Sequence, residues 1–137
     1  MEATMRRDAR KWTIRILAGL CVVLFALFWT AEILIGLGVR EFSQIAQDQF
    51  PSDRVSALMK MVDCESCAMA DRNHAVWALG QLADYRALPT LEKHYTGKPC
   101  DHFNKVCQSE IQKALRLVRS GYNTEALFWR WMLPDHG

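Results

Sequence analysis

One apolar segment constrains this chain more than any other feature. Residues 16–35 form a run of twenty in which Glu32 is the only charged residue and twelve are Leu, Ile, Val or Phe. Twenty residues of α-helix rise about 30 Å, which matches the hydrocarbon core of a bilayer. The apolar side chains contribute roughly −4 to −7 kcal/mol to insertion, whereas Glu32 costs at most about 3 kcal/mol. We therefore predict a transmembrane helix over 16–35.

A cleaved signal peptide is the alternative interpretation of this segment, with Gly36-Leu37-Gly38 as a weak cleavage site. Signal peptides carry a shorter apolar stretch, so we expect an uncleaved anchor. Glu32 lies near the end of the segment. We expect it to be a carboxylate at the outer membrane boundary rather than an intramembrane proton or ion site.

The charged residues around the segment predict its orientation. Residues 1–15 hold five basic and two acidic residues, whereas Arg40 is followed by Glu41, Asp48 and Asp53. The positive-inside rule then predicts a cytoplasmic basic stub at 1–15 and an extracytoplasmic remainder, in a cell (inner) membrane. The whole chain has 137 residues and a net charge of only +2. These values argue against a multidomain enzyme and against nucleic acid as a partner.

The transmembrane helix is expected to continue beyond the membrane. The apolar residues that follow it at helical spacing are Phe42, Ile45, Ala46 and Phe50. Because Pro51 cannot continue a helix, we predict one helical unit over 16–50. Within the span, Ala26 and Thr30 are small residues four positions apart, and this spacing lets helix backbones approach closely. They are candidate contacts with another integral-membrane subunit.

The rest of the chain has helical periodicity and no stretch that alternates with strand period. We predict that Ser52 and Asp71 are N-caps of two helices. The clearest helix is expected to begin near Phe103 and to end at Gly121, which suits a left-handed terminal position. The sequence therefore predicts an all-α domain over 51–121.

Residues 72–91 read Arg-Asn-His-Ala-Val-Trp-Ala-Leu-Gly-Gln-Leu-Ala-Asp-Tyr-Arg-Ala-Leu-Pro-Thr-Leu. The residues of this run that recur in a known motif are Ala78, Leu79, Gly80, Leu82, Asp84, Arg86, Ala87, Leu88, Pro89 and Leu91. On these residues the run resembles the HEAT-like repeat of the phycobilisome-lyase type. The resemblance covers about residues 71–95, with a degenerate continuation to about 118. It implies a helical scaffold that presents a docking surface to another protein, and it implies no chemistry.

The physical chemistry of this run agrees with such a repeat. Gly80 would let two helices approach closely, and Asp84 would cap the second helix through its N–H groups. Solenoids normally need about three repeats to bury a continuous core. Only one full repeat is recognisable here, so another source of stability is expected.

Four cysteines lie beyond the predicted membrane span, and their even number indicates disulfides with three possible connectivities. If Cys100 and Cys107 shared one helix, they would lie about 10 Å apart along its axis, which is too far for a bridge. In a HEAT-like pair, the loop before the first helix and the loop after the second lie at the same edge. The resemblance therefore favours the pairs Cys64–Cys100 and Cys67–Cys107. Each would add on the order of 4 kcal/mol.

Two other interpretations of the cysteines stay open. Cys64-Glu-Ser-Cys67 has the spacing of a thioredoxin-like centre, which would make the chain a membrane-tethered thiol–disulfide protein. Alternatively, zinc could be bound by Cys64, Cys67, Cys100, His102 and Cys107. The remaining sequence holds no catalytic motif, and we expect no catalytic residue, no cofactor and no small-molecule substrate.

The C-terminal part, residues 122–137, is predicted to form an aromatic helix and tail. Thr124 is expected to cap a helix over 125–133 that either covers the helical stack or contacts the membrane interface or a partner. We expect Trp129 to point outward. The residues predicted to bind partners are Ala26, Thr30, Trp77, Phe128, Trp129 and Trp131. Together these features predict a non-enzymatic, single-pass accessory or assembly subunit of a larger membrane complex.

Overall fold

The computed structural model describes the backbone of residues 2–100, 105–123 and 126–130, and the side chains of these residues except 2–9 and 127. The described elements, in chain order, are α1 (Glu2–Gln49), α2 (Arg54–Asp63), α3 (Met69–Leu82), η1 (Tyr85–Ala87), α4 (Leu88–His94), α5 (Gln108–Ser120) and α6 (Ala126–Trp129). η1 is a short 3₁₀ helix. No strand occurs within these ranges, which confirms the all-α prediction for this part of the chain.

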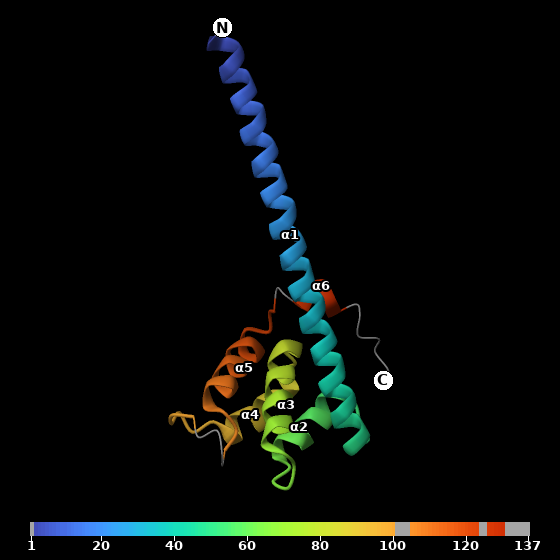
Figure 1. Ribbon diagram of the computed structural model, residues 1–137. Coiled ribbons are helices and arrows are strands. Elements are labelled where there is room, and N and C mark those ends of the chain that lie inside the picture. Colours follow the sequence, from blue (N-terminus) through green and yellow to red (C-terminus); the bar gives the residue numbers. More distant parts are fainter. Residues whose placement is uncertain (1, 101–104, 124–125, 131–137) are drawn as a thin grey trace.

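Helix α1 is one continuous rod that projects from a small helical bundle (Figure 1). Its 48 residues rise about 72 Å, far more than the length of any other helix in the bundle. One part of it is long and apolar enough to cross a membrane. The helix ends at Gln49, two residues before Pro51, as the sequence predicts.

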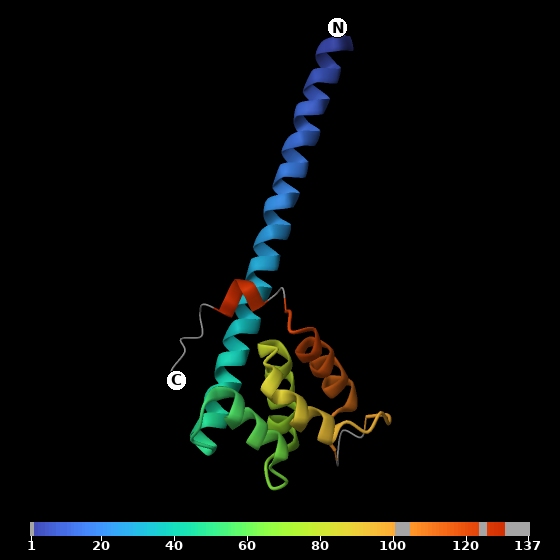
Figure 2. The same ribbon diagram turned by 180° about the vertical axis from the view of Figure 1, so that it is seen from behind.

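The bundle has two layers of helices. The C-terminal part of α1 lies beside α3, and α3 lies beside α5 (Figure 1). Helices α2 and α4 form a second row behind α1, α3 and α5 in Figure 1, and this row lies in front in the reverse view (Figure 2). The chain therefore alternates between the layers: α1, α3 and α5 belong to one, and α2 and α4 to the other.

Two predicted N-caps are wrong by a few residues. The cap of α2 is Asp53, whose carboxylate accepts the Ser56 N–H at 3.4 Å. Ser52 instead donates its hydroxyl to the Phe50 carbonyl at 3.0 Å, so its oxygen serves the preceding turn. Helix α3 begins at Met69, so Asp71 lies in its first turn, where a carboxylate is favoured by the helix dipole.

Gly121 lies where the sequence predicts it, whereas Asp84 caps the 3₁₀ turn before the second helix, because the N-cap residue of α4 itself is Ala87. Asp84 caps η1, since its carboxylate accepts the Arg86 N–H at 2.9 Å. Gly121 ends α5 with φ +61°, a left-handed conformation that glycine adopts without strain. Helix α5 starts at Gln108, later than expected, and Phe103 lies outside the described residues.

The main core is formed by apolar side chains of all helices from the end of α1 to α5. Its largest fully buried members are Leu58, Met61, Val62, Val76, Leu79, Leu91, Ile111 and Val118. Gly80 makes the closest approach within it: a Cβ at this position would lie 2.8 Å from the Ala114 Cα. Helices α3 and α5 can therefore pack this closely only because residue 80 has no side chain.

A second, smaller cluster lies where α6 crosses α1. It contains Val39, Ala126 and Trp129, with Trp77 and Leu82 packed against it. Of the predicted helix over 125–133, only residues 126–130 are described, and they are helical, with α6 over Ala126–Trp129. The predicted cap Thr124 and the predicted contact Trp131 lie outside the described residues.

Candidate functional site

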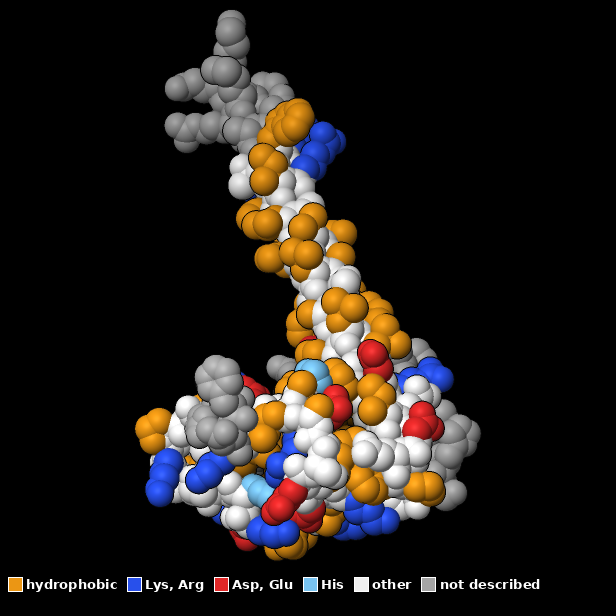
Figure 3. All heavy atoms as spheres, turned by 60° about the horizontal axis from the view of Figure 1, so that its bottom comes forward, with side chains coloured by type: hydrophobic (Ala, Val, Ile, Leu, Met, Phe, Trp, Pro, Cys, Tyr) orange, Lys and Arg blue, Asp and Glu red, His pale blue; other side chains and the backbone are white. Residues whose placement is uncertain are grey.

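The first candidate surface is the exposed part of α1. Every described side chain from residue 10 to residue 31 is exposed, and most of them are apolar (Figure 3). A helix that is apolar on all sides and stays uncovered by its own chain belongs in lipid or against another apolar helix. The predicted span at 16–35 thus has its described side chains available to lipid or a partner up to residue 31.

The small pair Ala26 and Thr30 lies within this exposed surface. The Thr30 hydroxyl donates to the Ala26 carbonyl at 2.8 Å, so its polar group is satisfied within the helix and needs no water. At 100° per residue, this pair lies on the opposite side of α1 from Glu32 and Val39, which face the bundle. The chain's own domain therefore leaves the small pair uncovered.

Burial of α1 begins abruptly at Glu32, whose side chain is only 4% exposed. Farther along, Val39 and Ser43 are buried, and the Ser43 hydroxyl donates to the Val39 carbonyl at 2.6 Å. Glu32 is therefore located at the junction between the exposed apolar part of α1 and the bundle. Its place at the outer membrane boundary stays a prediction, and no sequence pattern indicates that it would be buried.

Helix α6 lies against this junction. The Phe128 ring meets the rings of Phe28 and Trp29 edge-on, with centroids 5.5 and 5.9 Å apart. Arg130 donates to the Leu82 carbonyl at 2.8 Å and so fastens α6 to the end of α3. Residues 28–29 and residues 128–130 therefore lie together where α1 enters the bundle.

The expected outward orientation of Trp129 in α6 is wrong. Trp129 is fully buried against Val39, whereas Phe128 is 39% exposed and lies on the outer part of α1. Neighbouring residues differ by 100° around a helix, so the side that faces the core depends on how α6 is rotated. The sequence alone does not fix that rotation, because the segment is apolar nearly all round.

Trp77, the remaining predicted contact, lines an open groove between α1 and α3. The Phe42 ring stacks on His74 with centroids 4.0 Å apart and meets Trp77 edge-on at 6.0 Å. A Cβ on Gly38 would lie 3.2 Å from the Trp77 ring, so α1 fits against this ring closely. A cavity of about 310 Å³ is lined by Phe42, His74 and Trp77 together with Asn73 and Glu110.

A second depression adjoins the first and shares Trp77 and Glu110 with it. It has a volume of about 630 Å³ and lies between α3 and α5. Its rim is polar: Lys113 donates to the Glu110 carboxylate at 2.8 Å, and Arg116 also lines it. We call the two depressions together the α1–α3–α5 groove. It combines an apolar floor with a charged rim, which is the usual anatomy of a protein-binding surface.

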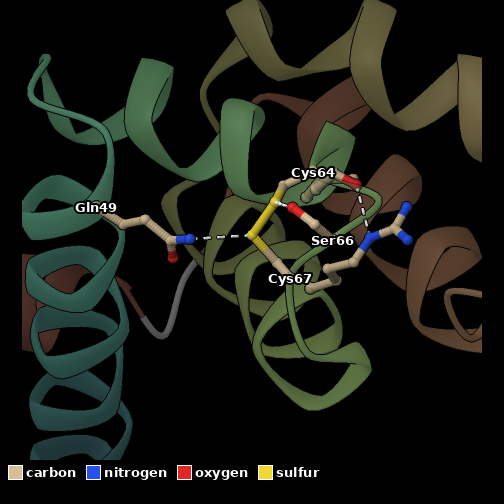
Figure 4. Close-up of a disulfide and its surroundings, with 6 residues drawn as sticks. Gln49, Cys64, Ser66 and Cys67 are labelled. Atoms are coloured by element: carbon tan, nitrogen blue, oxygen red, sulfur yellow. Dashed lines mark hydrogen bonds between the residues drawn. A yellow bond between two sulfur atoms is a disulfide. The ribbon is translucent and has the colours of Figure 1, made fainter.

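The cysteine pairing predicted from the resemblance is wrong. The structure has a local disulfide between Cys64 and Cys67, with 5.4 Å between their Cα atoms. Cys64 ends α2, and the Cys67 N–H donates to the Cys64 carbonyl at 3.4 Å, so a tight turn brings the two side chains together. The Gln49 amide donates to the Cys67 sulfur at 3.2 Å and ties this turn to the end of α1 (Figure 4).

The alternative zinc site is not assembled in the structure. Cys64 and Cys67 are bonded to each other, and His102 lies outside the described residues. Within the described ranges no group of three or more metal-ligating side chains converges. The other two members, Cys100 and Cys107, do come together, because both sulfurs contact the Ser109 hydroxyl.

The titratable side chains of the bundle form structural ion pairs. Asp63 at the end of α2 accepts from Lys93 at 2.9 Å and contacts the His94 ring nitrogen at 2.7 Å, which joins α2 to α4. Partial burial raises the pKa of Asp63, but the hydrogen bonds from Lys93 and His94 outweigh it and lower this pKa overall. These contacts join α2 to α4.

No family model matches the chain, and no curated protein and no solved structure is significantly similar to it. The likeness to HEAT-like repeats therefore stays a prediction from the chain's own residues.

Proposed function

We propose that this chain is a non-enzymatic, single-pass accessory or assembly subunit of a larger membrane protein complex. The observation that carries the proposal is the continuity of α1, which bears an exposed apolar surface up to residue 31 and contributes Phe42 to the α1–α3–α5 groove. Phe42 lies about 120° around α1 from Thr30 and about 160° from Ala26, so an integral-membrane partner that packs on this small pair would have to pass around α1 as it leaves the lipid to reach the groove.

The proposed occupant is a transmembrane helix of another subunit, together with the segment that follows it outside the membrane. Ala26 and Thr30 offer that helix a close approach within the bilayer. About 18 Å beyond Thr30 along α1, the stacked rings of Phe42 and His74 would receive the segment beyond. Glu110 and Lys113 at the rim would meet its polar side chains.

The two-layer arrangement supports a HEAT-like docking domain. Helix α1 packs on α2, α2 on α3, and α4 on α5, so in chain order α1–α2 and α3–α4 would correspond to two repeats and α5 would open a third. The first helix of the first pair is supplied by α1 itself. The membrane helix would thus serve as part of the repeat stack and replace a missing repeat.

The proposed orientation has the basic N-terminal stub in the cytoplasm and the bundle outside it. The Cys64–Cys67 disulfide supports this orientation, since disulfides persist in oxidising, extracytoplasmic compartments. The five basic residues within 1–15 support it as well.

The test is purification of the full-length tagged chain in a mild detergent, followed by mass spectrometry of the proteins that remain bound. Ala26→Phe should block close helix approach, and His74→Glu should place a charge in the groove. Each should reduce the recovered partner at least about tenfold, since a loss of 1.4 kcal/mol has that effect.

Matched controls come from other exposed positions. Ala18→Phe adds the same bulk at an exposed position about 80° around α1 from Ala26 and about 120° from Phe42, and Tyr85→Ala changes a side chain that is 75% exposed away from the groove. Both should retain the partner. Recovery of the wild-type chain as a lone monomer would contradict the proposal.

A second candidate function is thiol–disulfide exchange by a membrane-tethered domain, favoured by the two-residue spacing of the Cys64–Cys67 disulfide. Its equilibrium reduction potential separates the two functions. A value between roughly −270 and −120 mV is that of thiol–disulfide oxidoreductases, whereas a value below about −300 mV belongs to a structural staple.

A further inference from the structure

Two free thiols converge at the start of α5. Cys107 is the N-cap residue of this helix and is buried, whereas Cys100 precedes it in the chain and is half-exposed. The Ser109 hydroxyl lies 3.5 Å from the Cys100 sulfur and 3.1 Å from the Cys107 sulfur. Both sulfurs therefore surround a single oxygen atom.

The distance argument that separates these cysteines in the sequence does not apply to the structure. That argument places both on one helix, but α5 begins only after Cys107. The chain before the helix is then free to fold back over its first turn. The Ser109 N–H, which has no partner within the helix at that position, donates to the Cys100 sulfur at 3.2 Å.

The surroundings of Cys100 favour its thiolate. Hydrogen bonds from the Cys107 thiol and then from Ser109 lower the pKa of the Cys100 thiol to about 7. A thiolate near the positive end of a helix is the attacking species in thiol–disulfide exchange. Cys107, behind it and buried, is positioned as the second thiol of a pair.

The other three cysteines are already bonded or lie elsewhere in the chain. Cys64 and Cys67 are bonded to each other, and their sulfurs contact Ser66 and Gln49. Cys21 lies in the exposed part of α1.

We propose that Cys100 and Cys107 are the site of a second disulfide, formed by exchange with a disulfide-bearing oxidant. The Cys100 thiolate attacks one sulfur of the oxidant, the oxidant's S–S bond breaks, and one thiolate leaves. The Cys107 sulfur, after loss of its proton, then attacks the Cys100 sulfur and displaces the second thiolate. One protein dithiol is oxidised, and one disulfide is reduced to two thiols.

The inference does not rest on the proposed function, since it concerns the chain alone. The bond would fasten the segment before α5 to the first turn of that helix. It would thereby hold the α4–α5 side of the bundle, where a complete solenoid would have its next repeat.

Glutathione disulfide is the probe for the test. The full chain in detergent is first reduced, then treated with this disulfide, alkylated and digested with trypsin without reduction. Lys105 lies between the two cysteines, so the digestion separates residues 94–105 from residues 106–113. We expect these two peptides to be recovered as one disulfide-linked species, two hydrogen atoms lighter than their sum.

Variants identify the order of events. Cys107→Ser should stop the reaction with one glutathione attached to Cys100, and Cys100→Ser should leave Cys107 several-fold slower to react. Cys21→Ser is the matched control and should leave the linked peptide unchanged. Alkylation of both Cys100 and Cys107 after treatment, or a bond from either to Cys64 or Cys67, would overturn the proposal.

Discussion

Gly80 marks the point at which α3 and α5 touch most closely. Replacing Gly80 with alanine places a Cβ 2.8 Å from the Ala114 Cα and 2.9 Å from its Cβ, so the two helices must move apart. We expect Gly80→Ala to reduce the free energy of unfolding by about 1–3 kcal/mol, the usual cost of overpacking. Denaturant unfolding followed by circular dichroism measures this loss.

Gly19→Ala is the matched control for Gly80→Ala. Gly19 is also helical, but a Cβ there meets nothing within 4 Å. This change should leave the stability of the bundle unaffected. Equal effects of the two substitutions would show that helix propensity, rather than packing at Ala114, decides the result.

Asp84 and Arg86 predict a pH dependence at the acid end. The hydrogen bonds from the Arg86 guanidinium lower the pKa of Asp84 below its usual 3.8. A carboxyl whose pKa is lower in the folded state stabilises the fold above the unfolded value and loses that contribution as the pH falls through the folded value. The midpoint temperature of thermal unfolding should therefore fall as the pH is lowered below about 3.8.

Arg86→Gln should make the unfolding temperature depend less on pH in this acid range, which we call the acid limb. Because the pair is exposed, its contribution is limited to roughly 0.2–1 kcal/mol. Thermal unfolding from mildly to strongly acidic pH measures it. Arg119→Gln removes a 2.9 Å ion pair with Glu92 that does not involve Asp84, and it should leave the limb as in the wild type. Identical acid limbs in the wild type and Arg86→Gln would contradict the assignment.

At single residues, the sequence predicts what local chemistry decides. Asp84 and Gly121 occupy turns whose geometry their own side chains favour, so both could be placed in advance. The cysteine pairing could not, because it depends on where α5 begins. A start at Gln108 rather than near Phe103 frees Cys100 to reach Cys107.

Trp129 is the largest buried side chain of α6. Trp129 is fully buried in the small cluster with Val39 and Ala126, which is distinct from the main core. Trp129→Ala removes about 3–5 kcal/mol of packing and should release α6 while the main core stays folded. Hydrogen exchange of the amides of residues 126–129 should become at least about a hundredfold faster.

Phe128→Ala is the comparison for Trp129→Ala on the same helix. Phe128 is 39% exposed, so its loss should cost about 1 kcal/mol and accelerate exchange only several-fold. An effect of Phe128→Ala as large as that of Trp129→Ala would mean that the rings of Phe28 and Trp29, rather than Val39, hold α6 in place.

Among the elements, the long helix is the most predictable and α6 the least. Periodicity and Pro51 together define the end of α1, since both act within the helix itself. The rotation of α6 depends on the shape of the surface that receives it, formed by α1 and the end of α3. No pattern within residues 126–130 carries that information.

For the whole molecule, the two sides of the membrane provide the decisive measurement. In a chain whose free cysteines are replaced by serine, Thr4→Cys and Tyr85→Cys each place one thiol on an opposite side of the span. A membrane-impermeant maleimide added to intact spheroplasts should label Tyr85→Cys at once and Thr4→Cys only after permeabilisation. The reverse pattern would invert the proposed orientation.

Helix α1 is continuous between its exposed apolar part and the bundle. Any rotation of the predicted span about its own axis must therefore rotate the bundle through the same angle. One extra residue inserted after the span would offset the two by about 100° and 1.5 Å. A partner that binds both the apolar part of α1 and the bundle would be affected by this change. The angle between the apolar part and the bundle about the helix axis is therefore a property that this sequence determines.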